Sequence, residues 1–158
     1  MTVTTNETRT AADYAAVVSE FFDRYRAHDV HAMTDLCTVN ADFSYPAFEV
    51  WGKQSVLRAD GKVGTVGKAI WAGLIQAFPN LSNVVHSIEA NDVGDVVVQV
   101  DIGGTQQHAW GFITPAGKTY SEPHLFIFKV ETNGLISSIT GYWNNAGISQ
   151  QLGHIEVD

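Results

Sequence analysis

The stretch from Thr119 to Gly153 constrains the fold most, because it predicts two long strands joined by a tight hairpin. The hairpin falls at Thr132-Asn133-Gly134, where an Asn-Gly pair favours the positive backbone angles that such turns require. Successive side chains of a strand point to opposite faces of the sheet. One face of the first strand therefore carries an acid, an imidazole and two phenyl rings: Glu122, His124, Phe126 and Phe128.

One face of the second strand carries Ile139, Gly141, Trp143 and Asn145 by the same alternation. If the two faces look the same way, they form an aromatic wall with His124 at its polar centre. This wall is the candidate site that the sequence predicts.

Length and composition predict one domain with a substantial core. The chain has 158 residues, 45% hydrophobic and 16% charged. Its net charge of −8 disfavours nucleic acid and anionic membrane as partners, since both need a basic surface. No apolar run is long enough to span a bilayer, and the polar N-terminus is no secretory signal. We therefore expect a soluble, cytoplasmic protein.

The only cysteine, Cys37, excludes an intrachain disulfide. It lies in the apolar pattern of an expected helix. This setting favours a buried structural thiol over a nucleophile, which needs an electropositive environment.

The expected elements begin with helices and end with strands. We expect a flexible tail over residues 1–9 and a single domain over residues 10–158. Helical spacing of apolar residues predicts helices over 10–28, 30–37 (capped by Asp29) and 67–78. Strands are expected over 41–46, 82–89, 96–102 and 107–113, before the two of the hairpin. Pro46 ends the first of these or places it at an edge, and Gly103-Gly104 ends the third.

Residues 47–65 are the least regular part of the sequence and predict a loop or loose hairpin, which either covers a pocket mouth or is a plain connector. The order of elements indicates an α+β fold with a curved antiparallel sheet around the helices.

Several short segments resemble one family: Tyr45-Pro46, Phe78-Pro79-Asn80-Leu81, Glu122-Pro123-His124-Leu125, Gly141-Tyr142-Trp143-Asn144-Asn145 and Gln151-Leu152-Gly153. From about Ala12 to Gly153 the chain resembles the SnoaL-like polyketide cyclase branch of the NTF2-like superfamily. The resemblance implies a cone-shaped α+β barrel with three N-terminal helices, a deep apolar pocket, and homodimers through the outer face of the sheet. It also implies chemistry without metal or cofactor. The family's cyclases perform intramolecular aldol condensation, and relatives include ketosteroid isomerase, scytalone dehydratase, limonene epoxide hydrolase and members that only bind.

The resemblance keeps one catalytic position and loses another. The cyclases' histidine on the penultimate strand matches His124, whereas their aspartate base on the last strand falls on Gly141. Against ketosteroid isomerases, the catalytic aspartate falls on Tyr45, the helix tyrosine on Phe21, and the protonated aspartic acid on His124. Both comparisons point to His124, and neither finds its usual carboxylate.

Four residues are the candidate catalytic groups. His124 is a candidate acid or base, or else a core histidine bonded to the backbone. Glu122 would orient that ring, or is a solvated residue at a strand end. Tyr45 would donate to an enolate oxygen, or is structural. His86 assists only if its strand register turns it into the pocket.

Further residues are expected to shape the pocket or an interface. Pocket walls and ligand contacts are expected from Phe21, Tyr25, Trp71, Phe126, Gly141, Trp143 and Asn145. His108 and Trp110 either bracket a ligand or lie in the dimer interface. No metal-ligand cluster, phosphate loop or nucleophile elbow is present in the sequence.

The sequence therefore predicts a cofactor-independent enzyme that performs enolisation-type chemistry on a small hydrophobic, polyketide-like or cyclic ketone: cyclisation, isomerisation or dehydration. A non-catalytic binding protein that uses the same pocket is the alternative, which the missing carboxylate favours. An interaction module that uses the outer sheet is a third, weaker reading.

Overall fold

The structure is a computed structural model that describes residues 9–52, 55–110 and 113–153, with side chains described outside 47–58. Most of the expected tail lies outside the described residues. Its last residue, Arg9, donates from Nε to the carbonyl of Thr132 at 2.7 Å. The hairpin between the last two strands therefore holds the start of the domain.

The three expected helices are confirmed, with shorter bounds. They are α1 (Ala11–Arg26), α2 (Val30–Asp35) and α3 (Lys68–Ala77), with a π-helix over Val63–Gly67 before α3. Thr10 and Asp13 form a capping box at the start of α1, and Asp29 accepts from the Ala32 N–H at 3.0 Å at the start of α2. A fourth helix, α4 (Asn145–Gln151), follows the last strand.

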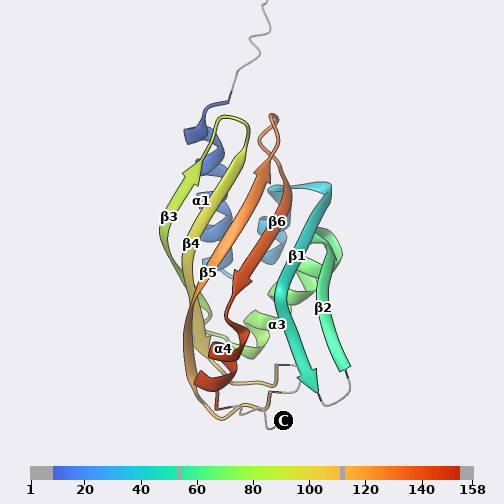
Figure 1. Ribbon diagram of the computed structural model, residues 1–158, viewed down its shortest axis with the longest axis vertical. Helices are drawn as coiled ribbons and strands as arrows, with labels where there is room; N and C mark the ends of the chain where they lie inside the picture. Colours follow the sequence, from blue (N-terminus) through green and yellow to red (C-terminus); the bar gives the residue numbers. More distant parts are fainter. Residues whose placement is uncertain (1–8, 53–54, 111–112, 154–158) are drawn as a thin grey trace, which may run out of the picture.

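Six strands form one sheet: β1 (Cys37–Gly52), β2 (Ser55–Lys62), β3 (Ser82–Ala90), β4 (Asp95–Thr105), β5 (Thr119–Val130) and β6 (Ile136–Trp143), in the order β2-β1-β6-β5-β4-β3. The sheet curls, and α1, α2 and α3 lie behind it in Figure 1. The α+β fold is thus confirmed. The expected antiparallel sheet proves mixed, because β1 runs parallel to β6 while the other neighbours are antiparallel.

The first strand is longer than predicted. It continues past Pro46, and residues 47–65, expected to be a loop or loose hairpin, contain the rest of β1, all of β2 and part of the π-helix, so the hairpin is the form found. The register between β1 and β2 shifts between Tyr45 and Val50, and pairing with β6 ends at Ser44. Pro46 therefore lies where the ladder is interrupted, so its missing N–H does not break a regular pair.

Gly103 and Gly104 do not end β4, contrary to the prediction. They pair with Ser121 and Tyr120 of β5. A Cβ on Gly103 would lie 2.2 Å from the backbone oxygen of Tyr120, so a close backbone approach requires the glycine here.

The predicted strand over residues 107–113 is wrong. The described part of this segment has only an isolated bridge between Trp110 and Ile113, and Phe112 lies outside the described residues. Trp110 packs against α3, where a Cβ on Gly73 would lie 2.9 Å from its ring. The ring is half-buried there and packs against the core. His108 is exposed in the same loop.

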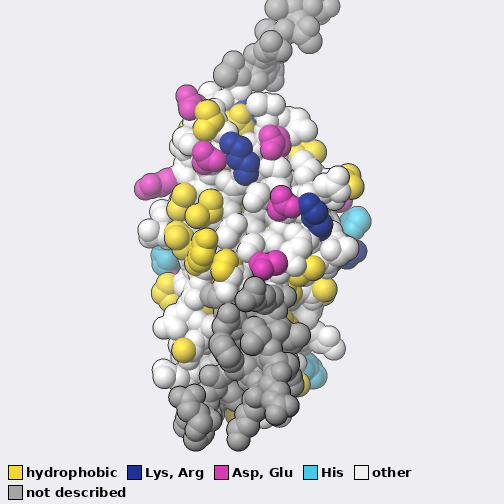
Figure 2. Space-filling view, turned by 45° about the vertical axis from the view of Figure 1, so that its right-hand side comes forward, with side chains coloured by type: hydrophobic (Ala, Val, Ile, Leu, Met, Phe, Trp, Pro, Cys, Tyr) yellow, Lys and Arg dark blue, Asp and Glu magenta, His cyan; other side chains and the backbone are white. Residues whose placement is uncertain are grey.

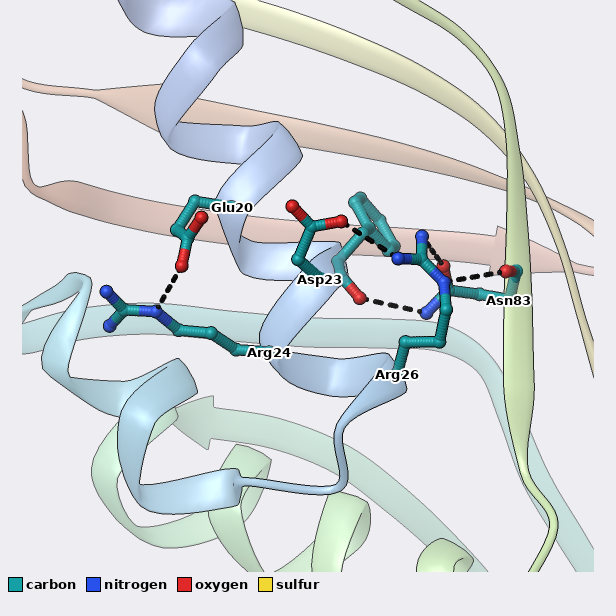
Figure 3. A network of polar contacts seen from close by, with 6 residues as sticks. Glu20, Asp23, Arg24, Arg26 and Asn83 are labelled. Carbon is teal, nitrogen blue, oxygen red and sulfur yellow. Dashed lines mark hydrogen bonds and ion pairs between the residues drawn. The ribbon is translucent and has the colours of Figure 1, made fainter.

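A polar network fastens α1 to β3 (Figure 3). Arg26 donates from Nη2 to Oδ1 of Asn83 at 2.8 Å and from Nε to its carbonyl at 3.1 Å. Asn83, itself buried, donates to the Phe22 carbonyl at 3.2 Å. Beside it Arg24 pairs with Glu20 at 2.9 Å and also donates to the Ala32 carbonyl of α2 at 2.7 Å. The bonds that involve Asn83 hold α1 against β3, and the bond from Arg24 to Ala32 holds α2 against α1.

The core lies between the helices and the inner face of the sheet. The helix α1 contributes the apolar side chains that recur at helical spacing. Five of them are buried: Tyr14, Val18, Phe21, Phe22 and Tyr25. The sheet contributes alternate residues, such as Val96, Val98 and Val100 of β4. Aromatic edge-to-face contacts dominate the centre, and Phe21 alone contacts Phe22, Tyr25, Trp71 and Phe128 at centroid distances of 5.3 to 6.4 Å.

Replacing Gly103 by alanine should destabilise the protein by about 1–3 kcal/mol, because the added methyl group must push β5 away. Gly64→Ala is the matched control: its Cβ meets nothing within 4 Å, so its free energy of unfolding should change by less than about 0.5 kcal/mol. Urea unfolding measures both. Equal stabilities for the two variants would contradict the close approach of β4 and β5.

Candidate functional site

The inner face of β5 and β6 forms the aromatic wall that the sequence predicts. His124 pairs with Trp143, Phe126 with Gly141 and Phe128 with Ile139, so the two predicted faces look the same way. His124, Phe126, Phe128 and Ile139 are buried, and Trp143 is half-buried.

His124 is held in one orientation by three neighbours. Its ring stacks on Trp143 at 5.1 Å and on Phe126 at 6.0 Å between centroids. Its Nδ1 lies 2.8 Å from the backbone carbonyl of Glu122. A carbonyl only accepts, so Nδ1 carries a hydrogen and Nε2 carries the lone pair of the neutral ring. Among the described residues Nε2 has no hydrogen-bond partner.

Burial lowers the pKa of His124 from 6.5 to about 4. The Glu122 carbonyl and the charge of Asp101 oppose this shift, but loss of solvation outweighs them. The ring is therefore neutral at physiological pH, with its basic nitrogen available.

Tyr45 completes the wall from β1. It contacts Trp143 at 4.9 Å and Phe126 at 5.9 Å between ring centroids, so it shares both ring neighbours with His124. Its hydroxyl accepts a hydrogen bond of 2.8 Å from Nε1 of Trp71. Burial raises the pKa of Tyr45 well above its ordinary value, which keeps the hydroxyl protonated.

Gly141 makes room for Tyr45. A Cβ on Gly141 would lie 2.8 Å from Cε1 of Tyr45 and 3.0 Å from Cε1 of Phe126. The space that an aspartate would need at this position is thus filled by two rings of the chain itself.

Glu122 contacts α4, and Asn145 is part of that helix. The carboxylate of Glu122 accepts from Nε2 of Gln151 at 2.8 Å; the contact with His124 comes from the Glu122 backbone. Asn145 is the first residue of α4, not a continuation of β6, because Asn144 caps the helix there. Its Oδ1 accepts from Nε1 of Trp143 at 3.3 Å, which fixes the wall's outermost ring.

His86 lies on the outer face of the sheet. Its side chain is 52% exposed, and its Nε2 lies 2.7 Å from Oδ2 of Asp101 on β4. An open depression of about 600 Å³ surrounds the pair, and seven other residues also line it: Gln99, Val100, Pro123, His124, Leu125, Tyr142 and Trp143. The register of β3 shifts between Val85 and Ser87, directly at His86.

The remaining predicted wall residues, Phe21, Tyr25 and Trp71, are buried in the centre of the core. Trp71 reaches the site through its bond to Tyr45, and Tyr25 contacts Trp71 at 6.3 Å between ring centroids. Phe21 contacts four other rings and reaches none of the wall residues other than Phe128 by a ring contact.

Two buried polar residues escaped the sequence reasoning. Tyr120 lies on the inner face of β5, in alternation with His124, so the period of two contains the signal. Gln106 follows β4 and is fully buried. It donates from Nε2 to the carbonyls of Ile113 at 2.8 Å and His108 at 3.1 Å, while its Oε1 has no partner among the described residues.

Among the described residues, no group of three His, Cys, Asp or Glu side chains is placed to hold a metal. Cys37 opens β1 instead of lying in a helix, and burial raises the pKa of its thiol to about 12, as expected for a structural cysteine.

The sequence profile of the SnoaL-like domain matches residues 18–139, so the chain belongs to the SnoaL-like domain family. Comparison with curated proteins gives no match. Among the described residues, no helix has the length and apolarity needed to cross a membrane.

Solved structures with low sequence identity share the fold. AclR from Streptomyces galilaeus, a candidate hydroxylase, is 16% identical with a TM-score of 0.74, covering 94% of this chain and 89% of its own. A candidate SnoaL-like polyketide cyclase from Jannaschia sp. CCS1 is 16% identical with a TM-score of 0.72, and the match covers 95% of this chain and 98% of the Jannaschia chain. SalBIII, an epoxide hydrolase/cyclase-like enzyme of pyran ring formation in salinomycin, is 18% identical with a TM-score of 0.65. The match covers 86% of this chain and 94% of SalBIII.

The lowered pKa of His124 predicts a specific loss of stability in acid. Between pH 6.5 and about 4 the unfolded chain binds a proton at this residue that the folded chain does not bind. The free energy of unfolding therefore falls as the pH falls through this window, by up to about 3 kcal/mol. His124→Gln should remove this part of the pH dependence.

Urea unfolding at pH 7.5 and 4.5 measures the effect, with His31→Gln, a change at an exposed helix position, as the control. If wild type and His124→Gln lose the same stability between the two pH values, the neutral buried histidine is contradicted.

Proposed function

We propose that this protein is a cofactor-independent enzyme that enolises a small hydrophobic ketone of polyketide-like or other cyclic type, and so promotes cyclisation, isomerisation or dehydration. The observation that carries the proposal is the state of His124. It is a buried neutral imidazole whose Nδ1 is bonded to a carbonyl and whose Nε2 faces no protein partner among the described residues.

In the proposed reaction, Nε2 of His124 takes a proton from the carbon beside the ketone. The C–H electron pair moves into the new C=C bond, and the carbonyl oxygen becomes an enolate. Tyr45 donates its hydroxyl proton to that oxygen as a hydrogen bond, and the aromatic rings exclude water. The imidazolium then returns the proton to a carbon or oxygen of the product.

Two proteins of similar fold support a ring-forming or related reaction. SalBIII, which shares the fold, acts in pyran ring formation, and the Jannaschia protein is a candidate polyketide cyclase. AclR, a candidate hydroxylase, indicates that the fold carries other chemistry as well, so the proposal depends on His124.

A non-catalytic binding protein is the second candidate. The observation that favours it is Gly141, at the position where the cyclases carry their aspartate base. The rings of Tyr45 and Phe126 occupy the space beside it, so no carboxylate fits without movement.

Exchange of the α-protons of a bound ketone distinguishes the two. Wild-type protein in D2O should exchange the α-protons of 2-tetralone-type and polyketide-like ketones above the buffer rate, followed by NMR. His124→Gln should slow this exchange by at least about 100-fold, the usual contribution of a general base, while ligand affinity stays within a few-fold.

His28→Gln, a change of a histidine outside the wall, is the control. Tight binding of ketones by the wild type without any exchange would reject the enzyme and support the binding protein.

We propose in addition that two copies associate through the outer face of the sheet, as the family resemblance implies. Five apolar side chains on the outer faces of β3, β4, β5 and β6 are 37–60% exposed: Val84, Val97, Leu125, Ile127 and Tyr142. Figure 2 shows hydrophobic side chains gathered on one face beside acidic and basic groups. Exposed apolar groups that adjoin in this way are typical of interaction surfaces.

A charge in this face should separate the copies. Ile127→Lys should convert a dimer to a monomer in light scattering at micromolar concentration, because burial of an unpaired ammonium opposes association. Val93→Lys, at a more exposed position in the turn between β3 and β4, should leave the dimer intact. A monomeric wild type would reject this interface.

A further inference from the structure

The short helix α4 begins just after β6 and turns back onto the start of β5 (Figure 1). The ladder between β5 and β6 ends at the pair of His124 with Trp143. Ser121 and Glu122 therefore extend beyond β6, and α4 takes the place of a strand beside them. Gln151, the last residue of α4, accepts at Oε1 from the Ser121 N–H at 2.9 Å and donates from Nε2 to Oε2 of Glu122 at 2.8 Å.

Both ends of the Gln151 amide are used, and every partner requires the same orientation of that amide. The Ser121 N–H only donates. The carboxylate of Glu122 and the carbonyl of Gly147, which lies 3.2 Å from Nε2, only accept. A glutamate at position 151 would offer no donor to Glu122 and would place a second negative charge beside it. The amide therefore holds the backbone and the carboxylate of this part of β5 together.

The residue that Gln151 holds is also the residue to which His124 is bonded. The backbone carbonyl of Glu122 accepts from Nδ1 of His124 at 2.8 Å. The two residues lie on one face of β5, two positions apart, so their Cα atoms are about 7 Å apart. A glutamate side chain is long enough to meet the imidazole across this distance. Gln151 keeps the carboxylate of Glu122 on α4 instead.

The first residue of α4 holds a second neighbour of His124. Oδ1 of Asn145 accepts from Nε1 of Trp143 at 3.3 Å, and the ring of Trp143 stacks on His124 at 5.1 Å between centroids. The helix therefore contacts the surroundings of the imidazole at both of its ends, once through Glu122 and once through an aromatic ring.

We propose that α4 positions His124 and that Gln151 is the positioning residue, which holds Glu122 so that its backbone carbonyl, and not its carboxylate, contacts the imidazole. The role of His124 as a base rests on the proposed function. With the carboxylate held away, the imidazole stays neutral and its Nε2 keeps the lone pair that a base needs.

Other titratable groups near the imidazole have partners of their own. Asp101 of β4, whose charge acts on the imidazole, lies 2.7 Å from Nε2 of His86 on β3. The hydroxyl of Tyr45 on β1 accepts from Nε1 of Trp71. The carboxylate that Gln151 holds is therefore the charged group whose distance from the ring α4 determines.

The pKa of His124 measures this role without requiring turnover. Gln151→Met removes the amide while it keeps a long side chain of similar helix propensity, so the carboxylate of Glu122 is released. A negative charge beside the ring stabilises its protonated form, so the pKa of His124 should rise from about 4 by about 1–2 pH units. An NMR titration of the 15N-labelled imidazole measures the shift, and at neutral pH it should show the Nδ1–H tautomer in the wild type.

Two further variants separate the effect of charge from a disturbed helix. Gln150→Met, at the exposed neighbouring position of α4, should leave the pKa of His124 as in the wild type. In the double variant with Gln151→Met and Glu122→Gln the released group is a neutral amide, so the pKa should return to near the wild-type value. Where the wild type exchanges ketone α-protons, the acidic limb of its pH–rate profile should move with the pKa in Gln151→Met.

Three results would overturn the positioning role: an unchanged pKa of His124 in Gln151→Met, an equal rise in the double variant or in Gln150→Met, and the Nε2–H tautomer in the wild type. The expected shifts without any α-proton exchange in the wild type would keep the positioning role and reject only the catalytic proposal.

Discussion

The hydrogen bond from Trp71 to Tyr45, buried among aromatic rings, is the contact on which the rest of the site depends. It joins α3 to β1, and the ring of Tyr45 can occupy its place only because β6 carries Gly141 there. A side chain at Gly141 would displace Tyr45 and leave the indole N–H buried without an acceptor, which is costly. The same displacement would remove a ring neighbour from Trp143 and Phe126, on which His124 stacks. Helix, sheet and candidate base are therefore positioned by one set of contacts.

Alternation along the last two strands predicted most of the wall, because a half-buried strand leaves a period of two in its sequence. His124, Phe126, Gly141 and Trp143 lie where that period places them. The failures have a different origin. The sequence predicts a strand end at Gly103, but the residue lies inside β4, where its close neighbour is the backbone of Tyr120, and the local sequence contains no sign of that approach. His86 lies beside a shift of register, and a single inserted residue decides which face such a side chain takes.

The polar surroundings of His124 were harder to predict than its position. The sequence places Glu122 on the same face as His124, which suggests a carboxylate that orients the ring. In the fold, α4 turns back so that Gln151 holds that carboxylate, while the backbone of Glu122 holds the imidazole. Asn145, which strand alternation places on β6, lies in α4 for the same reason. Asn144 caps this helix by accepting from the Gly147 N–H at 3.1 Å. Strand periodicity describes directions within one strand and cannot anticipate a helix that packs on it.

In the proposed reaction, the use of a buried histidine as base instead of an aspartate preserves more chemistry than it first suggests. With a pKa of about 4, His124 has nearly the basicity of an ordinary carboxylic acid, so as a base it is as weak as the residue that the cyclases use. The charge balance differs, however. A carboxylate passes its negative charge to the enolate, whereas a neutral imidazole creates an imidazolium and an enolate together. In a poorly solvated interior the two opposite charges attract strongly. A hydrogen-bond donor at the enolate oxygen then serves two purposes: it stabilises the new anion, and it holds the anion beside the cation. In the proposed reaction the hydroxyl of Tyr45, which packs on the same two rings as His124, is that donor, in place of a carboxylate on β6.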